Sequence, residues 1–224
     1  MVPPLAVDID GTLSRADRSI DPRVFDVLRS WEAPVVIATG KAIPFPIALC
    51  QFVGIRGRVI AENGGVSIAD GEEIVHGDRQ AANDVVDAYE AAGYELGWGE
   101  LDLANAWRET EVAVSRDSPL EPLENIAAAH GLEVVDSGYA YHVKSPAVDK
   151  GSALEDVAAR LDRSPKSFVA IGDSANDVGL MNTVATSYAV SNADDQAKAA
   201  ATHLLEGAYA DGFIEATERV RDGA

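Results

Sequence analysis

Short apolar runs alternate with helix-like segments at both ends of the sequence, and this alternation constrains the fold more than any other feature. Apolar runs of this kind are typical of parallel strands that helices cover on both faces. Strands are expected at residues 5–10, 35–39, 58–62, 168–171 and 187–190. Helices are expected between them, at residues 22–31, 45–53, 151–161, 174–184 and 194–201. The pattern predicts an α/β fold built on a doubly wound (Rossmann-like) parallel sheet.

The middle of the chain departs from this alternation. A hairpin is expected at residues 66–75, because Asp70-Gly71 supplies a turn between two strand-like runs. The elements expected next are a helix at 81–92, a strand at 111–115, a helix at 120–130 and two strands joined at Ser137-Gly138. This order contains no βαβ unit, so it indicates an inserted segment. We expect a core of residues 1–76 and 149–224 and a smaller α+β cap domain of residues 77–148.

The sequence is strongly acidic. Its 37 Asp and Glu residues against 18 Lys and Arg residues give a formal net charge of −19. Such a field repels polyanions, so we expect neither nucleic acid nor a membrane surface as a partner. Lysine is scarce, and salt would screen the self-repulsion of the acidic groups. We therefore interpret the chain as adapted to high salt (halophilic), with an ordinary acidic protein as the alternative.

Three further features favour a cytoplasmic protein. Cys50 is the only cysteine, so it forms no internal disulfide, and its apolar neighbours predict that it packs as a small hydrophobic residue. Apolar runs such as residues 35–38 are far shorter than the roughly 20 residues of a membrane helix. Asp8 and Asp10 stand where an export signal would be basic and then apolar.

The first candidate functional motif is Asp8-Ile9-Asp10-Gly11-Thr12, at the end of the first expected strand. The carboxyl ends of parallel strands border the crevice where ligands bind. Both carboxylates are therefore expected to face solvent and a substrate. The structural alternative is a turn with acidic residues at its caps.

The second motif is Gly172-Asp173-Ser174-Ala175-Asn176-Asp177, directly after another expected strand. Asp173 ends that strand and Asp177 lies one helical turn later, so both can lean over the crevice of the first motif. Carboxylates gathered in this way repel one another unless a cation neutralises them, and Mg²⁺ binds carboxylate, water and phosphate oxygens. The four histidines show no zinc spacing. The alternative is that these acids only complement a helix dipole.

Two more segments are typical of a phosphate site. Thr39-Gly40 follows an expected strand and offers a hydroxyl and backbone amides to an anion. Lys150-Gly151 starts a helix, so a cationic side chain and an N-terminal dipole converge on negative charge. Each segment also has a structural alternative, a common turn for the first and a surface lysine for the second.

In order and spacing, these motifs resemble those of haloacid dehalogenase superfamily phosphatases that carry a cap between the second and third motifs. The four motifs correspond to Asp8-Ile9-Asp10-Gly11-Thr12, Thr39-Gly40, Lys150 and Gly172-Asp173-Ser174-Ala175-Asn176-Asp177. The resemblance covers essentially the whole chain. Its size and cap look most like the archaeal phosphoglycolate phosphatases, relatives of the Cof-type branch. Many Cof-type members have Arg after the Thr-Gly motif, whereas this chain has Lys41.

The resemblance implies a role for each matched residue. Asp8 would be the nucleophile that forms an aspartyl-phosphate, and Asp10 would be the general acid and then the general base. Mg²⁺ would be the cofactor, with the ligands Asp8, Asp10 (through its backbone carbonyl), Asp173 and Asp177. The phosphate would be bound by Thr39, Gly40, Lys150 and Asn176.

The expected activity is hydrolysis of small phosphate monoesters, with phosphoglycolate as the first candidate. A sugar phosphatase, or a mannosyl-3-phosphoglycerate or sucrose-phosphate phosphatase, is the alternative, and a receiver-like signalling module is a more distant one. The cap is expected to exclude water and recognise the leaving group. Its candidate residues are Arg108, Glu109, Thr110, Tyr141, His142 and Lys144. Residues Glu62-Asn63-Gly64-Gly65 either border the pocket or form a glycine turn, and a homodimer is left open.

Overall fold

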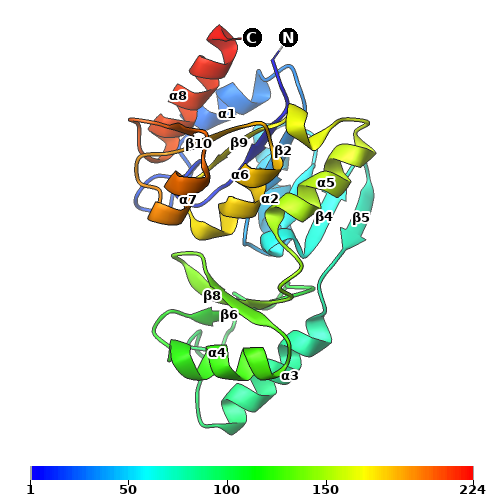
Figure 1. Cartoon of the computed structure of the whole chain (residues 1–224), viewed down its shortest axis with the longest axis vertical. Helices are drawn as coiled ribbons and strands as arrows, with labels where there is room; N and C mark the ends of the chain where they lie inside the picture. The colour runs from blue at the N-terminus through cyan, green and yellow to red at the C-terminus, as the bar shows by residue number, and fades with distance from the viewer. Residues whose placement is uncertain (1, 224) are drawn as a thin grey trace.

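The computed structural model describes residues 2–223, which form a large sheet flanked by helices and a smaller sheet backed by two helices (Figure 1). Over these residues the large sheet has eight strands in the order β11-β10-β9-β1-β2-β3-β4-β5. They are β1 (Leu5–Val7), β2 (Val35–Ala38), β3 (Val59–Ala61), β4 (Val66–Ala69), β5 (Glu72–Val75), β9 (Val169–Gly172), β10 (Thr186–Ala189) and β11 (His203–Leu204). Strands β11 through β3 are parallel, and β4 and β5 continue the sheet as an antiparallel hairpin.

Helices cover both faces of this sheet, which explains why its central strands are apolar at every position. The helices are α1 (Arg23–Arg29), α2 (Pro44–Val53), α5 (Lys150–Arg160), α6 (Val178–Thr183), α7 (Asp195–Ala200) and α8 (Tyr209–Asp222). Helices α1, α2 and α8 bury their apolar residues on one face, and α5 and α6 on the other. Cys50 of α2 is 1% exposed, which confirms that it packs as a small hydrophobic residue.

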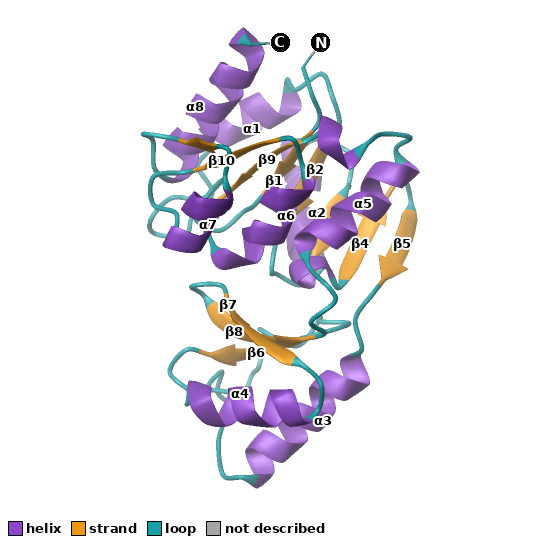
Figure 2. Cartoon of the chain, viewed as in Figure 1, coloured by secondary structure: helices purple, strands orange, loops and turns teal. Residues whose placement is uncertain are grey.

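The smaller body, which we call the cap, comprises the elements between β5 and α5. They are α3 (Arg79–Ala91), β6 (Val112–Ser115), α4 (Leu120–Ala129), β7 (Glu133–Asp136) and β8 (Ala140–Lys144). The three strands pair antiparallel in the order β6-β8-β7. Their sheet faces the core, while α3 and α4 cover its other side and enclose a separate apolar cluster (Figure 2). The expected fold class is therefore confirmed; the domain boundaries at residues 76–77 and 148–149 stay a proposal.

The structure refines the expected elements at several points. Strand β1 ends at Val7, so Asp8 and Asp10 lie beyond the strand. The helix expected at 174–184 is instead a 3-10 turn (Ala175–Asp177) followed by α6, because the Asp177 side chain accepts the backbone amides of Asp173 and Ser174 at its start. Strand β11 and helix α8 were not expected. Among residues 2–223, no helix is both long and apolar enough to span a bilayer.

Candidate active site

The centre of the candidate site lies where β1 and β9 end side by side. The two strands are parallel neighbours in which Val7 pairs with Ile171, and the Asp8 amide donates to the Ile171 carbonyl at 3.0 Å. Asp8 and Asp173, one and two residues farther on, are therefore brought to the same edge of the sheet. Oxygen atoms of Asp8, Asp173 and Asp177 lie within 4.8 Å of one another.

Lys150, the first residue of α5, is the cation of this centre. Its Nζ donates to Oδ1 of Asp8 and to Oδ1 of Asp177, each at 2.7 Å, and its side chain is fully buried. Asp149 caps the helix by accepting the Ser152 amide at 2.8 Å, which fixes where α5 begins. Gly151 lets α5 approach α6, because a Cβ there would lie 2.3 Å from the Gly179 carbonyl oxygen. The local sequence thus places the ammonium between Asp8 of the first motif and Asp177 of the second.

Electrostatics at this centre favour a bound cation. Burial, only partly offset by Lys150, raises the pKa of Asp8 to about 7. Burial and the neighbouring Asp8 raise the pKa of Asp173 to about 9. Burial favours a neutral Lys150, but Asp177 and Asp8 outweigh it and hold the pKa of Lys150 above its usual range. Two buried carboxylates and the half-buried Asp173, gathered around one ammonium, would carry an excess of negative charge that costs free energy when all three are ionised.

One buried oxygen makes the need for a ligand specific. Oδ1 of Asp173 is buried and forms no hydrogen bond with any group in residues 2–223. An orphaned carboxylate oxygen is costly unless a cation coordinates it. The donor set here contains only carboxylate oxygens, which suits a hard divalent ion rather than zinc. The residues present therefore fit a metal site.

The side chain of Asp10 is not part of this cluster, although it lines the same cleft as Asp8. It is 33% exposed and pairs with Nζ of Lys41 at 3.0 Å. Gly11 forms the turn that follows, with a φ of +86°, and a Cβ there would lie 2.1 Å from Oδ2 of Asp173. The chain at this point therefore requires glycine both for its conformation and for the close approach of Asp173.

The expected phosphate-binding residues surround the cluster without all meeting at one point. Thr39 is buried and its Oγ1 accepts the Lys41 amide at 3.1 Å. Gly40 follows it, and its carbonyl faces the cap. Asn176 donates to Oδ1 of Asn63 at 2.9 Å. Within the described residues, Asn176 forms no hydrogen bond to Lys150, and its role in binding phosphate stays a prediction.

Glu62 and Asn63, which the sequence left undecided, join the core to the cap. Both are 1% exposed and have left-handed backbones, with φ of 51° and 53°. The Glu62 carboxylate accepts the Thr110 amide and hydroxyl, each at 2.8 Å, and burial raises its pKa. Nδ2 of Asn63 donates to Oε2 of Glu111 at 2.9 Å. Strained, buried polar residues after a strand end are typical of a functional segment, and the Glu-Asn-Gly-Gly motif was its only sequence signal.

The cap candidates separate into distinct groups. Arg108 and His142 line a cleft of ≈ 330 Å³ over Asp8 and Asp10. The remaining lining residues are Gly40, Lys41, Ser137, Tyr139, Ser174 and Asn176. The backbone amides of Glu109 and Thr110 bind Glu62, and Tyr141 belongs to the apolar cluster of the cap. Lys144 instead binds Glu133 at 2.7 Å and the backbone near the end of the cap. Ser137 and Tyr139 were not among the sequence candidates.

Comparisons with known proteins agree with this geometry. A family model described as haloacid dehalogenase-like hydrolase matches residues 5–96 and 122–216. A protein of Halobacterium salinarum named phosphoglycolate phosphatase is 61% identical over 220 residues, covering 98% of this chain and 97% of the relative. One of the same name from Archaeoglobus fulgidus is 37% identical, covering 96% and 95%.

Solved structures show the same fold. A crystal structure of a Thermoplasma acidophilum protein superimposes with a TM-score of 0.87 at 25% identity and covers 99% of both chains. A haloacid dehalogenase-like hydrolase from Bacteroides thetaiotaomicron gives a TM-score of 0.79 at 18% identity and covers 98% of this chain and 100% of its own. With the family model matching both halves of the core, the chain belongs to the haloacid dehalogenase-like hydrolase family.

Proposed function

We propose that the protein is a Mg²⁺-dependent phosphatase of small phosphate monoesters and that 2-phosphoglycolate is its substrate. Relatives at 53–61% identity carry the name phosphoglycolate phosphatase and match nearly the whole chain. The observation that supports the chemistry most directly is the buried contact of Lys150 with Asp8 and Asp177, next to the unpartnered Asp173 oxygen. It supplies a carboxylate nucleophile, a cation for the phosphate and a place for a metal.

In the proposed reaction, a carboxylate oxygen of Asp8 attacks the phosphorus, and the bond from phosphorus to the ester oxygen breaks. Asp10, two residues later, gives its proton to the departing alkoxide and is left ionised. It then takes a proton from the water that attacks the aspartyl-phosphate. Hydrolysis releases inorganic phosphate and restores the Asp8 carboxylate.

The other groups stabilise the charge of the phosphoryl group. Lys150, the Thr39 hydroxyl and the Gly40 amide lie at strand and helix ends where a phosphoryl group can be bound. Asn176 would position this loop through Asn63. Held by Asp8, Asp173, Asp177 and the Asp10 carbonyl, Mg²⁺ would neutralise phosphate charge that otherwise repels the nucleophile.

The cap would exclude water and limit substrate size. Its Tyr139 lies over the core residues Lys41 and Arg18, whose charged groups are 4.9 Å and 5.0 Å from the ring centre. The cleft between core and cap encloses little space, which favours a short leaving group over a sugar or a phosphoprotein side chain.

A turnover screen tests the proposal. The purified protein is assayed with 2-phosphoglycolate, glucose 6-phosphate, sucrose 6-phosphate, mannosyl-3-phosphoglycerate and a phosphotyrosine peptide, each with Mg²⁺ and with EDTA. The highest kcat/KM is expected for 2-phosphoglycolate, and activity should vanish in EDTA. Preference for a sugar phosphate would mean that a sugar phosphate, and not 2-phosphoglycolate, is the substrate. Preference for the peptide, or full activity in EDTA, would contradict the proposal.

A further inference from the structure

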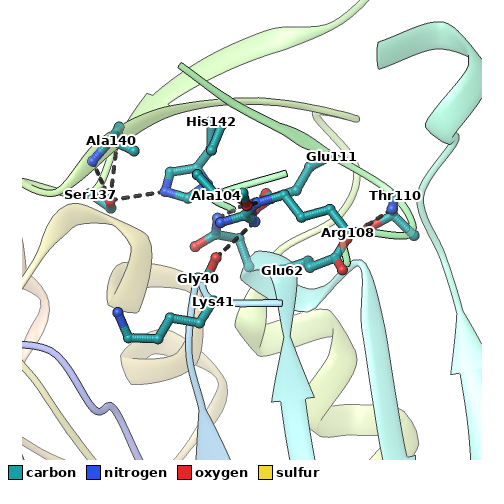
Figure 3. Close-up of polar contacts among 12 residues, drawn as sticks. Gly40, Lys41, Glu62, Ala104, Arg108, Thr110, Glu111, Ser137, Ala140 and His142 are labelled. Carbon is teal, nitrogen blue, oxygen red and sulfur yellow. Dashed lines mark hydrogen bonds and ion pairs between the residues drawn. The ribbon is translucent and has the colours of Figure 1, made fainter. Parts of the chain in front are cut away.

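Arg108 is the cationic residue of the cap that lines the cleft. Its side chain is only 4% exposed, although it lies in a loop before β6. Nε donates to the Ala104 carbonyl at 2.8 Å, and Nη1 donates to the Gly40 carbonyl at 2.9 Å and to Glu111 (Figure 3). Among residues 2–223, no group accepts a hydrogen bond from Nη2, and this nitrogen is not fully buried. Nε and Nη1 are therefore engaged, and the two N–H groups of Nη2 are the donors that remain free.

A buried polar network holds this guanidinium in place. Glu111, 1% exposed, accepts from Arg108 and from Nδ1 of His142 at 2.8 Å through the same oxygen, and from Asn63 through the other. His142 and Arg108 outweigh the effect of burial and hold the pKa of Glu111 below its usual value. Nε2 of His142 is 3.0 Å from Oγ of Ser137. Because its partners are already in position, Arg108 loses little freedom when it binds a ligand.

The other cations near the cleft are committed elsewhere. Lys150 is bound between Asp8 and Asp177, and Lys41 pairs with Asp10. Lys144 turns to Glu133 and the backbone. Of the two cations that line the cleft, Lys41 and Arg108, Lys41 is paired with Asp10, so Arg108 is the one left to bind a second negative group on the substrate. An N–H group of a guanidinium also forms a charge-assisted hydrogen bond with a carboxylate, which is stronger than a neutral one.

We propose that Arg108 determines specificity by donating, through Nη2, to the carboxylate that the leaving group carries next to the ester carbon. Glu111 and His142 act as positioning residues for it. This inference rests on the proposed phosphatase function and deepens it, because it names the group that recognises the acid part of the substrate. It also selects Arg108 over Lys144 as the residue that recognises the carboxylate, a choice that the sequence alone could not make.

The test compares two esters that differ in one group. 2-Phosphoglycolate carries a carboxylate, and 2-phosphoglycolamide carries a neutral amide of the same size. For Arg108→Leu, kcat/KM on the acid should fall about 10- to 100-fold, mainly through KM, as expected for a lost hydrogen bond to a charged group. On the amide it should change less than about threefold. Arg108→Lys keeps the charge but not the planar edge, so its loss on the acid should be smaller.

Lys144→Leu is the matched control, because it removes one positive charge from the cap at a residue that does not line the cleft. Any loss there should be equal for the two esters. Glu111→Gln tests the positioning role: it should raise KM for the acid while kcat stays nearly constant, and it should leave KM for the amide unchanged.

Each outcome decides the inference. Equal losses on the two esters in Arg108→Leu would mean that Arg108 only supports Gly40 and the fold, and would overturn it. If Arg108→Leu does not fold, the same comparison in Arg108→Lys decides. A wild type that hydrolyses both esters equally well would refute recognition of the carboxylate but leave the phosphatase in place. Hydrolysis of neither ester would refute the proposed function, and the inference with it.

Discussion

Nζ of Lys150 lies 2.7 Å from Oδ1 of Asp8, although 142 residues separate the two along the chain. The ammonium is fully buried and also touches Asp177, so one cation joins the first strand, the start of α5 and the loop after β9. This contact orients the proposed nucleophile before substrate arrives. Its removal would leave buried carboxylates without their partner.

Lys150→Met should therefore damage both stability and turnover. Breaking a buried ion pair from one side costs on the order of 3 kcal/mol of unfolding free energy. Losing a group that stabilises charge in the transition state should lower kcat about 10²- to 10³-fold. Urea unfolding and steady-state kinetics measure the two effects. The exposed Lys166, which binds the Asn182 carbonyl at 3.1 Å, is the control, and Lys166→Met should cost less than about 1 kcal/mol. Equal effects of the two substitutions would contradict the assigned role.

Asp173→Asn should change stability in opposite directions with and without metal. In EDTA the substitution removes a buried carboxylate whose pKa is raised to about 9, so the variant should be at least as stable as the wild type. With Mg²⁺, the wild-type Tm should rise because the ion binds only the folded state. The Tm of the variant should rise much less. Differential scanning calorimetry in EDTA and in Mg²⁺ measures these Tm values. If Mg²⁺ raised the Tm of the variant as much as that of the wild type, Asp173 would be excluded from the metal site.

The four motifs that the structure gathers at one edge of the sheet could be predicted from sequence because they are local. Each consists of a few residues at a strand or helix end, and strand ends in a parallel sheet meet at one edge. The pairing of Asp8 with Asp173 follows from that rule. The side chain of Asp10 could not be placed in this way, because its partner Lys41 lies on a different loop.

The sequence could not predict which cap residues line the cleft, because this depends on contacts between distant parts of the chain. Arg108 and Lys144 are both cap cations, and only the folded backbone decides that one lines the cleft and the other binds Glu133. Helix α8 was not predicted either. Its buried face includes the small residues Ala210 and Ala216, while charged residues dominate the rest of the helix.

Asp21 predicts a pH dependence of stability. It is 2% exposed, and hydrogen bonds from Arg23, with help from Arg15, hold its pKa well below the usual range. A carboxyl whose folded-state pKa is lowered stabilises the fold above its unfolded pKa of about 4, and this contribution disappears as pH falls toward the folded value. Asp21→Asn should therefore be less stable than the wild type at pH 7. The difference in unfolding free energy between the two proteins should become smaller below about pH 4.

Urea unfolding at a series of pH values measures that gap. Asp26, in the helix α1 that follows Asp21, is 91% exposed, so Asp26→Asn should change the free energy of unfolding by less than about 0.5 kcal/mol at every pH. A gap for Asp21→Asn that stays constant down to pH 2 would contradict the ionic role of Asp21.

The net charge of −19 predicts that salt stabilises the fold. Screening weakens repulsion between exposed carboxylates, so Tm should rise steadily from about 0.1 M to about 3 M KCl. Relatives from halophilic archaea fit this expectation. Sucrose at matched osmolality is the control, because it favours burial without screening charge. A Tm that is already maximal in dilute buffer would rule out salt adaptation.

The central claim is that Asp8 forms a covalent phosphoryl intermediate, and acid quenching of the reaction with ³²P-labelled 2-phosphoglycolate tests it most directly. The account predicts acid-stable ³²P on the peptide that contains Asp8, cleaved by hydroxylamine as an acyl phosphate is. It also predicts that Asp8→Asn, which keeps the shape of the side chain, carries no label and loses more than about a thousandfold in kcat. Near-normal turnover by Asp8→Asn, or ³²P located on another residue, would contradict the account.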